Sequence, residues 1–264
     1  MKRNFKIGIL SLILIIGSIG LIGCGASQEN KTENQAKEGT KTYTVVTDAT
    51  FPPFESTLPS GEVVGFDMDL VNAIAEVQGF KVNIQHVGWD PMMNSISTGK
   101  ADIGAAGITI DDERKQSYDF TEPYFEATQY ILVPEDSTVT SVDDLKEQNI
   151  GFQSGTTGEK AVQKVFGKDY AGAKGYVDLP TAVNDMLTGR IVAVVGDNAV
   201  LGEFLKQFPD KNLKVVKDDR FEKEFYGLMV KKGNQELLDQ LNAGLKKIKE
   251  NGKYQEIYNK YFAE

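Results

Sequence analysis

From residue 42 to the C-terminus, short apolar or β-branched runs alternate with longer segments in which apolar residues recur at helical spacing. Between Leu70 and Val77 they fall at i, i+3, i+4 and i+7, which predicts a helix with one buried face. Leucines and an isoleucine recur similarly over residues 237–248, where Asn234 is the expected N-cap. This alternation predicts an α/β protein with largely parallel sheets. The expected strands span residues 43–47, 81–87, 101–108, 130–133, 149–153, 191–195, 213–216 and 226–230.

One unit of this pattern occurs twice along the chain. In the first copy a helix begins at Pro91, ends at Gly99-Lys100 and leads into a strand. In the second copy the helix begins at Pro180 and ends at Gly189-Arg190. Proline suits the first turn of a helix and glycine its C-terminal cap, so each unit is also sensible by itself. The repetition predicts two similarly built lobes, and the alternative is chance recurrence of common helix-end residues.

The N-terminal segment has the features of an export signal. A basic head over residues 2–6 precedes an apolar run over residues 7–22, which is short for a membrane span. The run ends in Leu-Ile-Gly-Cys, which looks like a bacterial lipobox, and Cys24 is the one cysteine of the chain. Residues 1–23 are therefore expected to be a lipoprotein signal peptide and Cys24 to be lipidated. A plain signal peptide or an uncleaved anchor is the alternative. The polar residues 24–41 are expected to form a flexible tether that holds the protein at the outer face of the cell membrane.

Composition and missing motifs narrow the function. The chain has 264 residues, 38 of them acidic and 29 basic, and its net charge of −9 argues against a general nucleic-acid binder. One cysteine and one histidine offer no zinc cluster, so we expect no metal or cofactor. The lone His86 lies in an expected strand and is interpreted as a structural or surface residue, not a catalytic one. The P-loop, dinucleotide-binding and nucleophile-elbow motifs do not occur in the sequence, which favours binding over turnover.

Residues 107–114, Gly-Ile-Thr-Ile-Asp-Asp-Glu-Arg, carry the candidate chemistry, and we expect them to follow a strand and open a helix. A free amino acid presents a carboxylate and an ammonium on one carbon, so a site for it needs a forked cation and hydrogen-bond acceptors. Arg114 can supply the fork, while Thr109 and the carbonyl of Gly107 can accept from the ammonium. The alternative is that Arg114 is a surface helix residue paired with a neighbouring acid.

Several short motifs are specific as an ordered set, although each is weak alone. They are Asp-Ala-Thr-Phe-Pro-Pro-Phe at 48–54, Gly-Phe-Asp-Met-Asp-Leu at 65–70, Gly-Lys-Ala-Asp at 99–102, the segment 107–114, Phe-Thr-Glu-Pro-Tyr at 120–124, Gly-Thr-Thr-Gly at 155–158 and Val-Gly-Asp at 195–197. Through them the chain, from Tyr43 to its C-terminus, resembles the extracellular solute-binding proteins (family 3) of ABC importers for polar and basic amino acids.

The resemblance implies a two-lobed periplasmic-binding-protein-like α/β fold of type II, with a mostly parallel sheet flanked by helices in each lobe. Residues 42–124 and 224–264 would form lobe 1, and residues 125–223 would form lobe 2. Two hinge crossings would lie near residues 124–128 and 222–226. A ligand bound in the cleft would close the lobes, and the closed monomer would dock on a membrane permease without catalysis.

The resemblance also implies ligand contacts for Asp48, Phe51, Trp89, Gly107, Thr109, Arg114, Gln153, Thr156, Thr157 and Asp197. The α-carboxylate of the ligand would bind Arg114 and the backbone N–H of Thr157, at the start of a helix. The α-ammonium would bind Asp197 together with Thr109 and the carbonyl of Gly107. The alternative for Asp197 is a helix N-cap, a role that it could also combine with ligand binding.

The remaining positions concern the ligand's side chain. Trp89 and Phe51 would enclose its aliphatic part, unless Trp89 packs in the core, and Asp48 and Gln153 would face its far end. Some relatives that prefer glutamine carry Lys in place of Gln153 and His in place of Gly196. Because both are missing here, Asp48 is left without a cation, which predicts a basic ligand, arginine or lysine, ahead of glutamine.

Two rival functions stay open: an amino-acid-sensing lipoprotein that partners a receptor, and an exported dehydratase-like enzyme.

Overall fold

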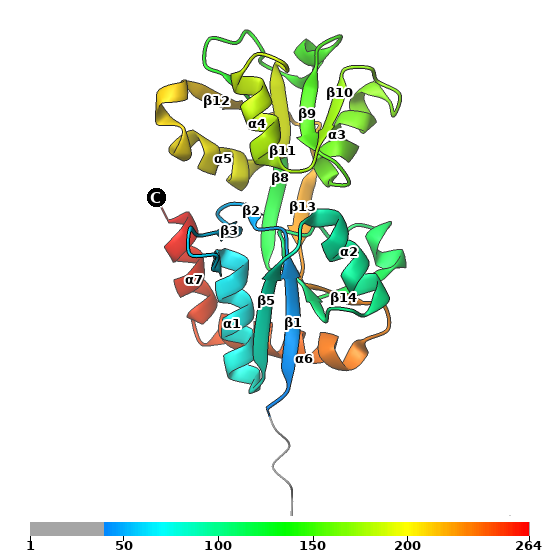
Figure 1. Ribbon diagram of the computed structural model, residues 1–264, viewed down its shortest axis with the longest axis vertical. Coiled ribbons are helices and arrows are strands. Elements are labelled where there is room, and N and C mark those ends of the chain that lie inside the picture. The colour runs from blue at the N-terminus through cyan, green and yellow to red at the C-terminus, as the bar shows by residue number, and fades with distance from the viewer. Residues whose placement is uncertain (1–39, 264) are drawn as a thin grey trace, which may run out of the picture. The chain divides into compact units, whose positions relative to one another are not determined.

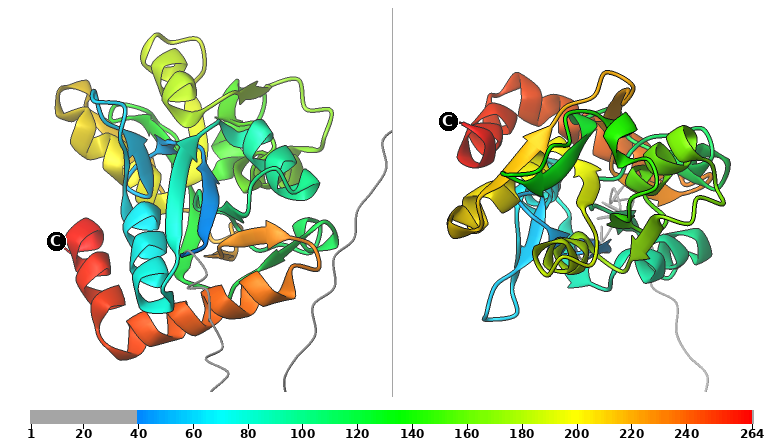
Figure 2. Two further views of the ribbon diagram at one scale, coloured as in Figure 1. Left: turned by 60° about the horizontal axis from the view of Figure 1, so that its bottom comes forward. Right: turned by 90° about the horizontal axis from the view of Figure 1, so that it is seen from above.

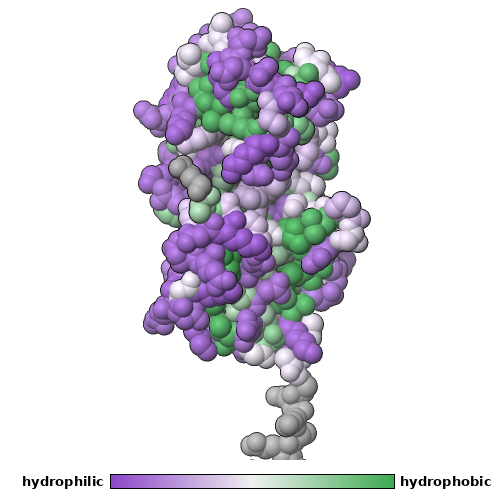
Figure 3. Space-filling view, turned by 90° about the vertical axis from the view of Figure 1, so that its left-hand side faces the viewer, coloured by the Kyte–Doolittle hydropathy of each residue, from purple (hydrophilic) through white to green (hydrophobic). Residues whose placement is uncertain are grey.

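The computed structural model describes residues 40–263, which form two α/β lobes arranged one above the other (Figure 1). The expected signal peptide, the lipidation site Cys24 and most of the expected tether lie outside these residues. Within residues 40–263, no helix combines the length and the apolar character needed to cross a membrane. The surface on one side is mainly hydrophilic, with apolar residues in separate smaller patches on each lobe (Figure 3).

Lobe 1 is the lower lobe in Figure 1. It contains β1 (Thr42–Thr47), α1 (Phe66–Gln78), β5 (Lys81–His86), α2 (Trp89–Thr98), β6 (Ile103–Gly104), η1 (Arg114–Gln116), β7 (Tyr118–Phe120), β14 (Met229–Lys231), α6 (Gln235–Glu250) and α7 (Lys253–Phe262), with a small sheet of β2 (Thr50–Phe51), β3 (Glu55–Thr57) and β4 (Val63–Val64). The main sheet has the order β5-β1-β6-β14-β7. β1 pairs in parallel with β5 and β6, whereas β14 is antiparallel to β6 and β7. α6 lies across the base of the lobe (Figure 2).

Lobe 2 is the upper lobe. It contains β8 (Phe125–Pro134), η2 (Val142–Leu145), β9 (Ile150–Gln153), α3 (Thr157–Phe166), β10 (Ala173–Tyr176), α4 (Leu179–Leu187), β11 (Ala193–Asp197), α5 (Asn198–Gln207), η3 (Pro209–Lys211) and β12 (Leu213–Val216). Its sheet has the order β10-β9-β11-β8-β12. β9 is parallel to β10 and β11, whereas β8 is antiparallel to β11 and β12.

The two sheets have the same order and the same pairing pattern, which confirms the prediction of two similarly built lobes. The helices of the repeated unit, α2 and α4, occupy equivalent places. Each leads into the strand that is third in the order of its sheet, β6 in lobe 1 and β11 in lobe 2. The sheets are mixed, however, and not mostly parallel. β8 and β14 each enter a sheet from the hinge side and therefore run against their neighbours.

Two strands cross between the lobes. β13 (Lys223–Tyr226) pairs in antiparallel register with the start of β8, with Lys223 opposite Thr128 and Tyr226 opposite Phe125. The two segments expected as crossings therefore pair with each other, while the exact lobe boundaries stay a prediction.

Aromatic packing anchors the lower end of the crossing to lobe 1. The ring of the fully buried Phe54 lies 4.8 Å from that of Phe125 and 5.2 Å from that of Tyr226. Phe262 of α7 and Phe66 of α1 close the same cluster, at 5.4 and 6.0 Å from Phe54. Because these rings come from lobe 1 and from both crossing strands, they fix where the hinge leaves lobe 1.

Strand lengths differ from the predictions in two places. The expected strand 101–108 contains only the two residues of β6, because the chain then bends towards Gly107, whose φ is 53°. The apolar residues that suggested a longer strand are buried within a loop. The expected strand 226–230 is divided between β13 and β14. The short strands β2, β3, β4, β7 and β10 were not predicted.

Helix ends also differ from the predictions. α2 begins at Trp89, so Pro91 is its third residue and not its first. Asn234 occupies the N-cap position of α6 but makes no capping hydrogen bond with its side chain. The helix expected at Arg114 is the single 3-10 turn η1, because the chain enters β7 directly afterwards. α1 contains the predicted apolar stripe and follows Gly65.

Gly65 generates a stability prediction. Its φ is 145°, and a Cβ there would lie 2.0 Å from the carbonyl oxygen of Phe54, which is backbone and cannot rotate away. We expect Gly65→Ala to lower the free energy of unfolding by more than about 2 kcal/mol in urea denaturation. Gly202→Ala in α5 is the matched control, since a Cβ there meets no atom within 4 Å, and it should raise stability by up to about 1 kcal/mol. Similar effects of the two substitutions would contradict this account.

Candidate functional site

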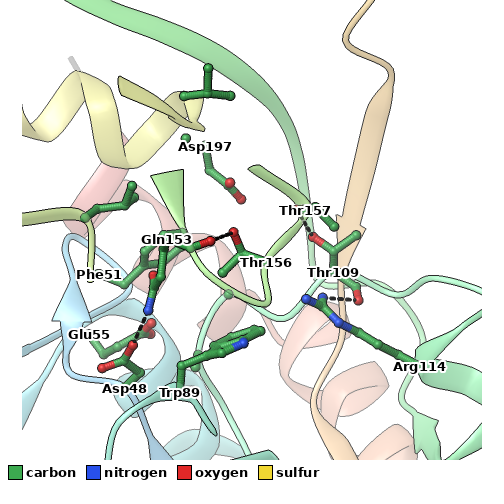
Figure 4. A pocket seen from close by; sticks show the side chains of 15 residues that line it. Asp48, Phe51, Glu55, Trp89, Thr109, Arg114, Gln153, Thr156, Thr157 and Asp197 are labelled. Carbon is green, nitrogen blue, oxygen red and sulfur yellow. Dashed lines mark hydrogen bonds between the residues drawn. The ribbon is translucent and has the colours of Figure 1, made fainter. Parts of the chain in front are cut away.

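All ten residues expected to contact a ligand line one cavity between the lobes (Figure 4). Asp48, Gln153 and Asp197 lie at or just beyond the carboxyl ends of β1, β9 and β11. In α/β sheets these ends are the usual position of ligand sites. Ligand contact by the ten residues stays a prediction. The other lining residues are Glu55, Ala106, Leu179, Val195 and Gly196.

Within residues 40–263, Arg114 is the one cationic side chain that lines this cavity. It is 6% exposed, and its guanidinium donates to the carbonyl oxygens of Thr109 at 2.8 Å and Gly155 at 3.3 Å. Asp111 accepts from the backbone N–H of Arg114 at 2.7 Å, and its carboxylate lies 3.8 Å from Nε. The interpretation of Arg114 as a surface helix residue is therefore wrong. Burial lowers the pKa of Arg114, which makes an anionic ligand group a favourable partner.

Aromatic groups form the walls beside Arg114. The guanidinium carbon lies 5.1 Å from the ring centroid of Trp89, whose Nε1 donates to the carbonyl of Gly155 at 3.2 Å. Trp89 is half-buried at the cavity wall, so it is more than a core residue. A Cβ at Gly107 would lie 2.7 Å from the ring of Phe51. This close approach, together with the positive φ of residue 107, explains why that residue is a glycine.

The start of α3 also faces the cavity. Thr156 occupies the N-cap position, and its hydroxyl donates to the carbonyl of Gln153 at 2.7 Å. The first N–H groups of a helix, here beginning at Thr157, have no intrahelical acceptor, and the helix dipole favours an anion near them. Arg114 and the start of α3 line the same cavity, which makes two donors available to one carboxylate.

Asp197 is buried and accepts hydrogen bonds from Gln129 at 2.5 Å and from the hydroxyl of Tyr226. It occupies the N-cap position of α5, but its side chain makes no capping hydrogen bond, so capping is not its role. Burial, with the nearby charge of Glu224, raises the pKa of Asp197 to about 7. A cationic group in the cavity would favour its ionised form.

Asp48 and Gln153 join the lobes across the cavity. Nε2 of Gln153 donates to Asp48 at 2.7 Å and to the carbonyl of Val177 at 3.1 Å. Thr50 donates to the other carboxylate oxygen of Asp48 at 3.1 Å. Burial raises the pKa of Asp48. A neutral amide is therefore the cross-lobe partner of this acid.

Glu55 lines the same cavity and was not among the predicted ligand contacts. It is fully buried, and neither of its carboxyl oxygens has a hydrogen-bond partner in the part of the chain that the structure describes. Burial, together with Asp67, Asp48 and Asp197, raises its pKa well above the usual value. Its place directly after the Phe-Pro-Pro-Phe motif was the available signal, but a glutamate in a turn-rich segment more often faces water.

Asp67 supports the cavity from behind and was also missed as a functional residue. It is fully buried, and one oxygen accepts from the N–H of Gly107 at 2.9 Å and from the hydroxyl of Tyr124 at 2.7 Å. The other oxygen has no partner. Burial raises the pKa of Asp67 to about 7. Asp67 thereby fixes the peptide of Gly107, whose carbonyl is an expected ligand acceptor.

An ion-pair cluster bridges the lobes at the rim of the cavity. Nζ of Lys160, on α3, lies 2.9 Å from the carboxylate of Asp111 and 2.7 Å from that of Glu113.

His86 is exposed at the end of β5 and lies outside the cavity lining, and its Nδ1 accepts from the N–H of Ala49 at 2.9 Å. Among residues 40–263, no group of His, Cys, Asp and Glu could hold a metal ion.

Comparison with known proteins gives consistent matches. The profile of bacterial extracellular solute-binding proteins, family 3, matches residues 43–264. A probable histidine-binding protein of Neisseria gonorrhoeae is 39% identical, covering 96% of this chain and 95% of that protein. A putative ABC transporter arginine-binding protein 2 of Escherichia coli (strain K12) is 34% identical, covering 84% and 91%. The structure of the arginine-, lysine-, histidine-binding protein ArtJ of Geobacillus stearothermophilus is 44% identical, with a TM-score of 0.82 and coverage of 85% and 96%. This likeness confirms the two-lobed α/β fold.

The buried acids predict how stability depends on pH. The folded-state pKa of Asp67, about 7, lies above its unfolded value near 4, so folding favours the protonated form. Stability is therefore present at low pH and is lost as pH rises from about 4 through 7. We expect Asp67→Asn, which stays neutral, to flatten this loss in the unliganded protein, by up to about 4 kcal/mol between pH 4 and 8. Denaturant unfolding at several pH values measures it. The exposed Asp112→Asn is the control, and equal pH slopes in all three proteins would contradict the assignment.

Proposed function

The chain belongs to the bacterial extracellular solute-binding proteins of family 3, and on this premise we propose that it captures a free L-amino acid with a cationic side chain for an ABC importer. The observation that carries the proposal is the charge of the cavity, which is lined by three carboxyl groups and one guanidinium. The relatives named for binding histidine, arginine and lysine support it. Arginine or lysine is preferred to glutamine.

The α-groups of the ligand use one end of the cavity. The carboxylate pairs with Arg114 and with the backbone N–H of Thr157 at the start of α3. The ammonium pairs with Asp197, Thr109 and the carbonyl of Gly107. The ligand's carboxylate thus balances the charge of Arg114, and its ammonium balances that of Asp197. Asp48 and Glu55 are left without a positive partner.

The two remaining acids give the reason for a cationic side chain. Glu55 has no hydrogen-bond partner, and Asp48 has only neutral ones. A buried carboxyl group is stabilised in its ionised form by a positive charge nearby. A guanidinium or ammonium at this end would supply that charge. Phe51 and Trp89 would cover the aliphatic part of the ligand, and Gln153 and Thr156 would complete the wall.

Closure of the lobes is supported by contacts that cross the cleft. Arg114 and Trp89 of lobe 1 both donate to the carbonyl of Gly155 in lobe 2. Lys160 reaches Asp111 at the rim. Ligand binding adds contacts to both lobes at once, which shifts the population towards the closed form. The closed form then docks on the permease.

We further propose where the protein resides. Family membership gives an extracytoplasmic protein. We infer that Cys24 is lipidated after removal of residues 1–23, and that residues 24–41 tether a monomer to the membrane. Lobe 1 would then comprise residues 42–124 and 224–264, and lobe 2 residues 125–223.

A panel of the twenty amino acids tests the function in thermal unfolding of the protein beginning at residue 25. A ligand at about 100 times its dissociation constant should stabilise the fold by roughly 2.7 kcal/mol and raise the unfolding midpoint by several degrees. We expect this shift with arginine, lysine or histidine. Protein refolded from denaturant controls for ligand retained through purification. A shift with glutamine alone would contradict the cationic preference, and no shift at all would contradict amino-acid binding.

The two unmatched acids give a sharper prediction. Asp48→Asn and Glu55→Gln each keep the side-chain shape and remove one negative charge. We expect each to weaken arginine binding about tenfold or more, since a hydrogen bond to a charged group contributes about 1.5–3 kcal/mol, while any glutamine affinity changes much less. Calorimetric titration measures both. Asp112→Asn is the control, because that side chain is fully exposed and lies outside the cavity. Arginine affinities within about twofold of wild type in both variants would refute the role of these acids.

A further inference from the structure

Glu224 lies behind the cavity wall, on the crossing strand β13. One of its carboxylate oxygens accepts from the hydroxyl of Thr109 at 2.6 Å and from the hydroxyl of Thr157 at 2.7 Å. Its other oxygen accepts from Nε2 of Gln129 at 3.3 Å. Both threonines line the cavity and Glu224 does not. Glu224, on a strand that crosses between the lobes, therefore accepts hydrogen bonds from Thr109 of lobe 1 and Thr157 of lobe 2.

The direction of these hydrogen bonds determines what the threonines can offer a ligand. A hydroxyl has one proton and two lone pairs, and a carboxylate can only accept. The two hydroxyl oxygens lie 3.5 Å apart, but their shorter contacts are those to Glu224. When both hydroxyls donate to Glu224, only oxygen lone pairs remain for the cavity, and Thr157 also accepts from Nε2 of Gln129 at 3.4 Å. Thr157 can then donate to the ligand through its backbone N–H alone.

Asp197, the acid next to Glu224, adds a further hydrogen-bond acceptor to this part of the cavity. Gln129 donates through the NH2 group of its side chain to Asp197 at 2.5 Å and to Glu224 at 3.3 Å, so one amide group serves both carboxylates. Asp197 and Thr109 are the proposed partners of the α-ammonium. An ammonium group has three donors and no acceptor, whereas an oxo group can only accept.

We infer that Glu224 is a positioning residue, which fixes the hydroxyls of Thr109 and Thr157 as acceptors and so makes the site select an α-amino group. The inference rests on the proposed function and deepens it. Glu224 does not touch the ligand in this arrangement. It acts through the threonines, and its place on the hinge strand makes the acceptor pair complete only when both lobes are close.

Selectivity between two ligands tests the inference. L-Arginine and 5-guanidinopentanoic acid differ only in the α-amino group, and their dissociation constants are measured by calorimetric titration, with competition for the weaker one. In Glu224→Gln the side-chain amide donates to a threonine hydroxyl, whose proton then turns towards the cavity. We expect the preference for arginine over the analogue to fall about tenfold, with little change for the analogue itself.

The control variant removes the same negative charge as Glu224→Gln at a position away from the threonines. Glu222→Gln removes a carboxylate two residues away, which is exposed and paired with Lys164 outside the cavity, and it should keep the wild-type preference. Glu224→Asp, which retains the charge but is too short to hold both hydroxyls, should give an intermediate preference and is the second variant if Glu224→Gln does not fold.

Two outcomes overturn the inference and are distinguishable. If Glu224→Gln weakens both ligands by the same factor, Glu224 is merely structural and the inference fails while the proposed function stands. If the wild-type protein binds no amino acid, the proposed function itself fails, and the inference with it. A selective loss of arginine affinity in Glu224→Gln, absent in Glu222→Gln, supports it.

Discussion

A surplus of buried acid is the constraint on which the cavity depends. Asp48, Glu55 and Asp197 line it, Asp67 lies behind it, and Arg114 is the one cation in its lining. Burial raises the pKa of each of these acids, and neighbouring carboxyl groups add to the effect at Asp48, Glu55 and Asp197, whereas a cationic group nearby would favour their ionised forms. The proposed cationic ligand would add a positive charge to a lining that is mainly acidic.

The fold distributes this charge between parts that move relative to one another. Asp48 of lobe 1 takes a hydrogen bond from Gln153 of lobe 2, and Asp197 of lobe 2 takes one from Tyr226 of the hinge. Asp48 is therefore hydrogen-bonded across the boundary between the lobes, and Asp197 is hydrogen-bonded at the crossing. Opening of the cleft would remove the Gln153 hydrogen bond from Asp48, so lobe closure would be coupled to the ionisation of this acid.

The sequence was sufficient to predict the fold class and to predict that the ten expected site residues lie together. The reason is that the ordered motifs identify the family, and members of a family share their strand order. It was insufficient where burial decides the chemistry. Nothing in the sequence distinguishes the buried Glu55 from an exposed turn residue. The bonds of Glu224 to Thr109 and Thr157 join three distant segments, which only tertiary structure brings together. The single turn at Arg114 was missed because charged residues there also suit a helix.

The position of β14 has a consequence for assembly of the nascent chain. β14 fills the gap between β6 and β7 in the middle of the lobe 1 sheet, yet it is made after the whole of lobe 2. All strands of the β10-β9-β11-β8-β12 sheet precede residue 217. A chain that emerges N-terminus first can therefore complete its second sheet before its first, and until residue 231 is available the edges of β6 and β7 remain unpaired. During that interval the edges of β6 and β7, in the lobe that contains Arg114, are open to pairing with another chain.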